Sequence, residues 1–328
     1  MKTKNLLFHL SFWFIFFFIS PCHAEDNVQI ISSYNMAQYD NVIENFYYNN
    51  PGFKTLPVEE KIIKASSLFL GKPYNLGALG EGPVGKLDQD PLYRTDSFDC
   101  MTFVSTVLAL VNSANLQEFK NNIKKINYKN GNVAYFKRNH FTNIDWNKNN
   151  QYNNFLEDYT NKLIDENGKI IAEVSTTIIN RPSWYLQKTA ANIKLLTKPN
   201  KDSVQNLLSS LHDFSLQTSP VKSKIYFLPL NKLFSADKTP HQYLFNQISS
   251  GSVIEIVRPK WNLKNEIGTD LDVSHMGIAL RINNNLIFRE ASSSEKFGEK
   301  VIDVPLIEYL QNCLSNQTIK GINVQKIL

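Results

Sequence analysis

Residues 275–291 constrain the fold of this chain more than any other stretch. Two alternating apolar runs, "HMGIALRI" and "LIFREA", flank the triplet "NNN", which predicts two antiparallel strands joined by a tight turn. Because alternate side chains of a strand point to opposite faces, the apolar residues from Met276 to Ile282 would share one buried face. His275 and Gly277 would share the other, which is small enough for the end of a helix to approach His275.

A second polar residue of this hairpin falls on the face of His275. If the turn uses two residues, Asn283-Asn284 or Asn284-Asn285, Glu290 lies opposite or diagonal to His275 and within reach of its ring. A register shift of one residue would separate the two side chains. A lone histidine at the start of a strand is usually structural, so the pairing needs support from elsewhere in the chain.

That support comes from "RTDSFDCMTFVSTVLALV", residues 94–111, in which a cysteine stands at the start of a predicted helix. Ser97 or Asp99 would cap the helix, and the apolar residues that follow recur at the spacing of a buried stripe. Cys100 lies one turn before that stripe on the same face, so its sulfur would point inward. The unpaired N–H groups and the helix dipole favour a thiolate there.

A helix and a glycine-rich loop precede this cysteine. "PVEEKIIKASSLFL", residues 57–70, is amphipathic, with an acidic pair in its first turn and Gly71 and Pro73 after its end. "GKPYNLGALGEGPVG", residues 71–85, predicts a loop in which the backbone comes close to another group. The loop lacks the Gly-Lys-Ser/Thr ending of a phosphate-binding motif.

The first residues indicate export. Lysines precede an apolar run over residues 6–19, and small residues up to Ala24 lead into acidic ones, which predicts a signal peptide over residues 1–24. Lipidation at Cys22 is an alternative, although Pro21 fits it poorly. No later stretch reaches the roughly 18 apolar residues that a membrane-spanning helix needs. We therefore expect an exported monomer, periplasmic or secreted, without stable membrane insertion.

Composition excludes several classes of partner. The net charge of +5 is mild for 328 residues, and no basic run with interleaved aromatic residues suggests nucleic acid. The histidines that remain after cleavage show no His-x-x-x-His pairing, so we expect no metal and no other cofactor. Cleavage would leave Cys100 and Cys313, and a disulfide between them is an alternative to a free thiol. Cys313 lies in "LIEYLQNCL", which reads as an ordinary buried helix.

A long segment, about residues 112–250, separates the cysteine from the histidine. Lys- and Asn-rich pieces alternate in it with aromatic ones, and no repeat is detectable. Aromatic stripes either line grooves or form cores, and the sequence leaves both open. We expect "NHFTNIDW", residues 139–146, at the rim of a cleft. "SVIEIVRP", residues 252–259, predicts a strand that alternates around one buried face.

Four motifs occur in the order seen in the NlpC-like cell-wall cysteine peptidases, and the chain resembles that superfamily from about residue 55 to 328. They are "GKPY" (71–74), "FDC" (98–100), "SHMGIAL" (274–280) and "REAS" (289–292). The contexts "DCMTFV" and "LDVSHMG", with the long insertion between them, are similar to one branch, formerly of unknown function and then described as N-acetylmuramoyl-L-alanine amidases.

The resemblance implies an α+β, papain-like fold in which the nucleophile helix packs on an antiparallel sheet. It implies Cys100 as nucleophile, His275 as general base and Tyr74 as a hydroxyl donor beside them. Where the superfamily often has a histidine, this chain has Glu290, whose carboxylate can accept the other ring N–H of His275 and stabilise the imidazolium. Substrate contacts are expected from five residues: Asp99, Ser274, His140, Asp145 and Trp146.

The implied reaction hydrolyses the amide between N-acetylmuramic acid and L-alanine of muropeptides through a thioester to the cysteine. One alternative is a peptidase that cuts between D-glutamate and the diamino acid of the stem. Another, from a different class, is a catalytically dead wall-binding module, against which the intact Cys100 and His275 argue.

Overall fold

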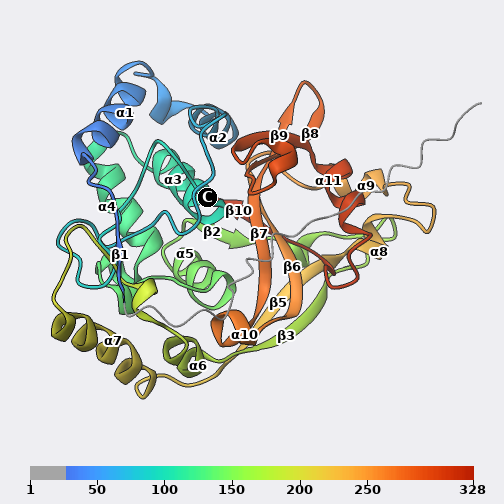
Figure 1. Ribbon diagram of the computed structural model, residues 1–328. Helices are drawn as coiled ribbons and strands as arrows, with labels where there is room; N and C mark the ends of the chain where they lie inside the picture. The colour runs from blue at the N-terminus through green and yellow to red at the C-terminus, as the bar shows by residue number, and fades with distance from the viewer. Residues whose placement is uncertain (1–26) are drawn as a thin grey trace, which may run out of the picture.

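The structure, a computed structural model, describes residues 27–328, and the predicted signal peptide with Cys22 lies outside them. It confirms an α+β protein with an antiparallel sheet (Figure 1). The strands follow the order β3-β5-β10-β6-β7-β8-β9, with β2 paired to β10. Their bounds are β2 Leu156–Asp158, β3 Glu173–Ile179, β5 Val221–Pro229, β6 Ser252–Leu263, β7 Thr269–Ile282, β8 Asn285–Ala291, β9 Val301–Pro305 and β10 Gly321–Ile327.

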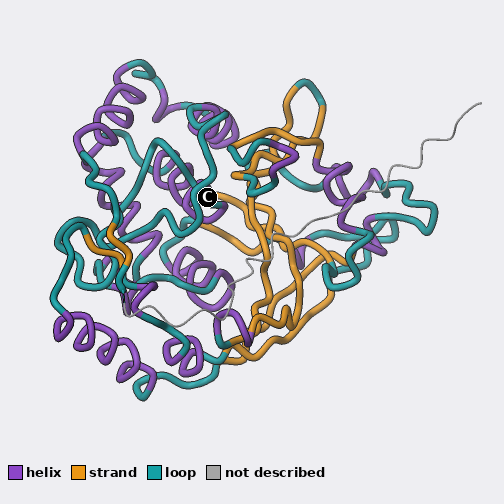
Figure 2. The backbone as a smooth tube through the Cα atoms, viewed as in Figure 1, coloured by secondary structure: helices purple, strands orange, loops and turns teal. Residues whose placement is uncertain are grey.

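Helices cover both sides of this sheet, and Figure 2 shows most of them on one side. They are α1 Met36–Tyr48, α2 Val58–Ser67, α3 Cys100–Val111, α4 Leu116–Asn127, α5 Lys148–Tyr152, α6 Arg181–Leu186, α7 Lys201–Ser215, α8 Leu230–Leu233, α9 Gln242–Asn246, α10 Lys264–Ile267 and α11 Leu306–Cys313. The π-helix η4, Thr142–Asn147, leads into α5, and the short strands β1 (Gln29–Ile30) and β4 (Lys194–Leu195) pair in parallel. Within the described residues, none of these helices combines the length and the apolar character needed to span a membrane.

The predicted hairpin is confirmed. Strands β7 and β8 pair from Ile278↔Arg289 to Ile282↔Asn285, which leaves Asn283 and Asn284 as a two-residue turn. Both asparagines have positive φ, 50° and 66°, as a tight turn with the right-handed twist of a hairpin requires. The register therefore follows the first of the two turns that the sequence allowed.

The two faces of the sheet bury two separate cores. Met276, Ile278 and Leu280 pack with α3 in the first, while Ala279 and Phe288 belong to the second, together with α11. The room beside Gly277 is filled by the Phe288 ring and not by a helix end, because a Cβ at Gly277 would lie 2.6 Å from that ring.

The insertion is part of the central fold and not a separate domain. About residues 112–250 supply strands β2 to β5, so part of the central sheet is built from the insertion. Its helix η4 also packs against β5 and β7. As a result β6 is covered on both faces, and residues 252–257 are all buried, which corrects the predicted alternation around a single buried face.

Candidate active site

Cys100 is the first residue of α3, and the local sequence fixes the helix start at this point. The Asp99 carboxylate accepts a hydrogen bond from the Thr102 N–H (2.7 Å), and the Thr102 hydroxyl accepts one from the Asp99 N–H (2.9 Å). This reciprocal capping box confirms Asp99, and not Ser97, as the cap. The half-buried Cys100 therefore sits where free backbone N–H groups and the helix dipole favour a thiolate.

His275 and Glu290 meet across the β7–β8 hairpin. His275 Nε2 hydrogen-bonds to Glu290 Oε2, and the pairing register places the two residues diagonally. The Glu290 side chain is only 3% exposed, and that of His275 is 18% exposed. Because Nε2 faces the carboxylate, Nδ1 is the ring nitrogen left for a second partner.

The Cys100 side chain also interacts with this ring. Burial alone would lower the pKa of His275, but the charge of Glu290 and the hydrogen bonds to Cys100 and Glu290 outweigh it and raise this pKa to about 10. An imidazole that keeps its proton at neutral pH stabilises a neighbouring thiolate. The geometry thus brings together the three residues that the sequence singled out as nucleophile, base and orienting acid.

Tyr74 lies beside this group. Burial raises the pKa of its hydroxyl, and the charges of Cys100, Asp99 and Glu290 raise it further. The backbone is held by a bridge to Phe98 and by a hydrogen bond from the Tyr74 N–H to the Glu299 carbonyl (2.7 Å). A protonated hydroxyl next to the sulfur is available as a donor.

Two of the residues expected to contact substrate adjoin this site, but their polar groups already have partners. Besides the Thr102 N–H, the Asp99 carboxylate accepts a hydrogen bond from the Gly77 N–H (3.2 Å). Ser274 stands at an irregularity where the β6–β7 register shifts, and its hydroxyl donates to the Ile256 carbonyl (3.4 Å). Their contact with substrate stays a prediction.

His140 and Asp145 are instead held within the insertion. The His140 ring lies 4.8 Å from the Tyr135 ring, with Nε2 hydrogen-bonded to the Tyr135 carbonyl (2.8 Å). Burial, then the charge of Arg138, keeps the pKa of His140 well below its usual value. Asp145 forms an ion pair with Arg181. The structure does not bring these two residues to Cys100.

Trp146 corrects the expectation that "NHFTNIDW" forms a cleft rim. The side chain is fully buried in the core around α3, and its indole N–H donates to the Ser105 hydroxyl (2.9 Å). The large apolar area of the indole stabilises the fold when buried, provided that its N–H finds a partner, as it does here. The sequence left open whether the aromatic residues of the insertion line a groove or form a core, and Trp146 belongs to a core.

The glycine-rich loop approaches its own chain. A Cβ at Gly80 would lie 2.1 Å from the Asp90 carbonyl oxygen, so residues 77–92 fold back on themselves without room for a side chain. The Lys194 ammonium, from the insertion, binds both the Gly77 carbonyl (2.9 Å) and the Asp90 carboxylate (2.8 Å). A separate hydrogen bond from the Gly77 N–H to the Asp99 carboxylate ties the loop to the start of α3.

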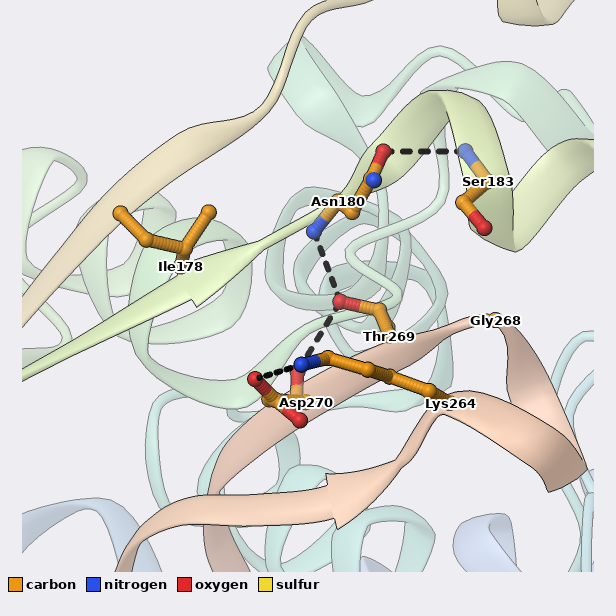
Figure 3. A pocket seen from close by; sticks show the side chains of 7 residues that line it. All are labelled: Ile178, Asn180, Ser183, Lys264, Gly268, Thr269 and Asp270. Atoms are coloured by element: carbon orange, nitrogen blue, oxygen red, sulfur yellow. Dashed lines mark hydrogen bonds and ion pairs between the residues drawn. The ribbon is translucent and has the colours of Figure 1, made fainter.

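Two pockets lie outside this group of residues. One, of about 320 Å³, opens between the end of β3, α6, α10 and the start of β7, where Lys264 reaches Asp270 (Figure 3). The other, of about 890 Å³, has a mainly apolar wall formed by the glycine-rich loop, residues 133–136 and α7. Neither is lined by Cys100, His275 or Glu290. Among residues 27–328, His, Cys, Asp and Glu side chains nowhere gather in threes as metal ligands would.

Two neighbours of His275 were missed by the sequence analysis. The Phe288 ring lies edge-on to the imidazole at 6.0 Å, and the Tyr309 ring of α11 is roughly parallel to it at 6.4 Å. The alternation of β8 could have placed Phe288 on the face of Glu290. No local signal places α11 beside β7.

The site combines a cysteine at a helix start, a histidine on a strand and a carboxylate bound to that histidine, within an α+β fold. This arrangement is typical of cysteine-dependent hydrolases. The sequence matches the family model of AmiA-like, N-acetylmuramoyl-L-alanine amidase-like proteins over residues 64–319. The chain therefore belongs to this family.

Solved structures share the fold of this chain. A DUF1460 protein from Legionella pneumophila is 41% identical, with a TM-score of 0.84 over 89% of this chain and 95% of that chain. An N-acetylmuramoyl-L-alanine amidase from Bacteroides uniformis is 25% identical, with a TM-score of 0.55 over 83% of this chain and 99% of that chain. A putative xylanase from Bacteroides fragilis, 23% identical with a TM-score of 0.54 over 80% and 99%, shares the fold alone. No curated protein matches the sequence.

Proposed function

We propose that this protein is a cysteine-dependent N-acetylmuramoyl-L-alanine amidase with an NlpC-like, papain-like fold, exported and acting as a monomer on muropeptides. The observation that carries the proposal is the arrangement of Cys100 at the start of α3, next to a His275 ring that Glu290 holds from behind. Membership of the amidase-like family supports peptidoglycan as the substrate. No cofactor enters the proposed reaction.

In the acylation step, the Cys100 thiolate attacks the carbonyl carbon of the lactyl group and forms a tetrahedral adduct. The backbone N–H groups at the start of α3 and the Tyr74 hydroxyl hold the oxyanion. His275 passes its proton to the departing nitrogen, so the C–N bond breaks and the stem peptide leaves with a free L-alanine amine. The sugar remains as a thioester on Cys100.

In the second step, neutral His275 takes a proton from water, and the resulting hydroxide attacks the thioester. Collapse of the adduct releases the muramic acid carboxylate and restores the Cys100 thiolate beside the protonated ring. Glu290 stabilises that imidazolium in both steps, which is the role of the acid in serine-protease triads.

Mass spectrometry of defined substrates tests the proposal. The mature protein, incubated with a sugar-linked muropeptide, should release a stem peptide that begins with L-alanine, and it should leave a sugar-free stem peptide uncut. The acyl group passed to Cys100 belongs to the sugar, so an amidase of this kind needs the sugar. A sugar that still carries a dipeptide would show a stem peptidase instead, and no product at all, with the Cys100→Ser variant as control, would support a wall-binding module.

A further inference from the structure

Helix α11 closes one side of the His275 ring. Tyr309 lies in its middle, and the Tyr309 and His275 rings are roughly parallel, with an interplanar angle of 28° and centroids 6.4 Å apart. The buried residues of α11 recur at helical spacing and pack on the second core, and they hold Tyr309 in position. They are Leu306, Leu310 and Cys313.

Phe288 completes this enclosure. Its fully buried ring lies 4.9 Å from the Tyr309 ring and meets the imidazole edge-on at 6.0 Å. Gly277 makes room for it, because any side chain there would collide with Phe288. The imidazole therefore has Glu290 at Nε2, Cys100 beside it and two packed aromatic rings on its flank.

We propose that Tyr309 is a positioning residue for His275, whose ring keeps the imidazole turned so that its two nitrogens face Glu290 and Cys100, and which keeps water away from the Glu290–His275 pair. This inference rests on the proposed function in one respect, the use of Cys100 and His275 as the reacting pair. A ring without a packed flank would rotate about its Cβ–Cγ bond, and water would screen the attraction between the two charges.

The other titratable groups that face this site support such a role because they stay neutral. Burial raises the pKa of Tyr74 and of Tyr309, and burial together with the charge of Glu290 raises that of Cys313 to about 12. The imidazolium thus interacts with two groups that can carry negative charge, the Glu290 carboxylate and the Cys100 thiolate. Opening the flank to water would weaken both interactions and would also relieve the burial that lowers the pKa of His275. Because the two interactions outweigh burial in the fold, the net result would be a return of this pKa toward 6.5.

The test compares Tyr309→Leu, which removes the aromatic ring, with Tyr309→Phe, which keeps it. NMR titration follows the imidazole signals of the mature protein. Its histidines are His140, His212, His241 and His275. The signal that is missing from the spectrum of the His275→Ala variant belongs to His275. In Tyr309→Leu the pKa of His275 should fall by about one pH unit or more, and in Tyr309→Phe it should stay within a few tenths of the wild-type value. With a muropeptide substrate, Tyr309→Leu should lose about tenfold to a hundredfold in kcat with little change in KM.

Ile307→Ala is the matched control for damage to α11. It removes an apolar side chain of the same helix that packs on the second core and carries no titratable group, so it should lower the melting temperature and leave the titration of His275 unchanged. If the Tyr309→Leu protein is too unstable to titrate, Tyr309→Met is used in its place, because methionine also fills much of the space without an aromatic ring.

Two results would overturn the proposal. One is a Tyr309→Leu or Tyr309→Met protein whose His275 titrates as in the wild type, and the other is an equal shift of the His275 pKa in Ile307→Ala. The titration needs no substrate, so failure of the amidase assignment would appear in the product analysis and leave this measurement intact.

Discussion

Glu290 binds His275 Nε2 from a position diagonal to it across the β7–β8 pair, one strand away from the histidine and two residues from the tightly packed Phe288. A two-residue turn at Asn283 and Asn284 sets this geometry, because a register shifted by one residue would turn Glu290 to the opposite face. The charge state of the imidazole therefore depends on the length of a turn some distance along the hairpin.

The first prediction concerns the charge on Glu290. Glu290→Gln still offers an oxygen to Nε2 but carries no charge, so the imidazolium loses stabilisation and the pKa of His275 falls from about 10. The alkaline limb of the kcat/KM profile should then move to lower pH by roughly one to two units. The rate at neutral pH should lie between those of the wild type and His275→Ala. Glu295→Gln, an exposed acid of the loop after β8, is the control, and a Glu290→Ala enzyme as fast as wild type would remove Glu290 from the mechanism.

The second prediction separates the two thiols. Iodoacetamide should alkylate Cys100 quickly, because its neighbour His275 stays protonated at neutral pH and favours the thiolate. Cys313 is 5% exposed, and its raised pKa keeps it as a thiol, so it should react only after unfolding. Peptide mapping of the labelled protein gives the result. Cys100→Ser should lose both fast labelling and turnover while it keeps its fold, and near-native turnover in that variant would refute the nucleophile.

The third prediction follows from the burial of Trp146. Trp146→Ala leaves a cavity beside α3 and removes the partner of Ser105, so it should lower the free energy of unfolding by about 3–5 kcal/mol. Trp146→Phe keeps most of the apolar volume and should cost less. Urea unfolding measures both. A Trp146→Ala protein of normal stability but raised KM would restore the residue to the rim of the cleft.

The fourth prediction concerns Glu255, which is fully buried on β6. Burial raises its pKa from 4.5 to about 8, and its Oε1 has no partner, as is also true of Oδ1 of Asn147, whose amide donates to Oε2 (3.0 Å). Between pH 4.5 and 8 the unfolded chain releases this proton and the folded protein keeps it. The free energy of unfolding therefore falls as pH rises, by about 1 kcal/mol per pH unit from this group.

Glu255→Gln should remove that slope, because an amide does not titrate and its N–H₂ can donate to the unpartnered Oδ1 of Asn147. Urea unfolding at pH 5 and at pH 8 should show a variant that gains stability over the wild type as pH rises. Glu166→Gln, at an exposed position, serves as the control. Parallel pH slopes in wild type and Glu255→Gln would mean that Glu255 is ionised in the fold.

The parts of the site that the sequence predicts correctly are those set by short-range rules. The helix start at Cys100 follows from a cap three residues from its partner Thr102, and the approach of Glu290 to His275 follows from alternation and a tight turn. In both cases the chain itself fixes the distance between the groups. A pattern of a few residues is then enough to predict the contact.

The errors come from contacts between distant segments. Trp146 is buried because it meets Ser105, 41 positions away, and nothing near it in the sequence distinguishes a core indole from a sugar-binding one. Glu255 follows a pattern that would place it toward solvent, but Asn147 of the insertion covers that face. Tyr309 reaches His275 only because α11 folds back over the sheet. Such contacts are decided by the packing of the whole chain.

The last strand of the chain, β10, lies in the interior of the sheet, with β6 on one side and β5 and β2 on the other. The two halves of the sheet therefore cannot be joined until residues 321–327 are in place between them. Until then β6 and the insertion strands expose unpaired backbone, and the long-range pairing that closes them is slow. A truncation that removes residues 321–328 would leave two open sheet edges and a chain prone to aggregation.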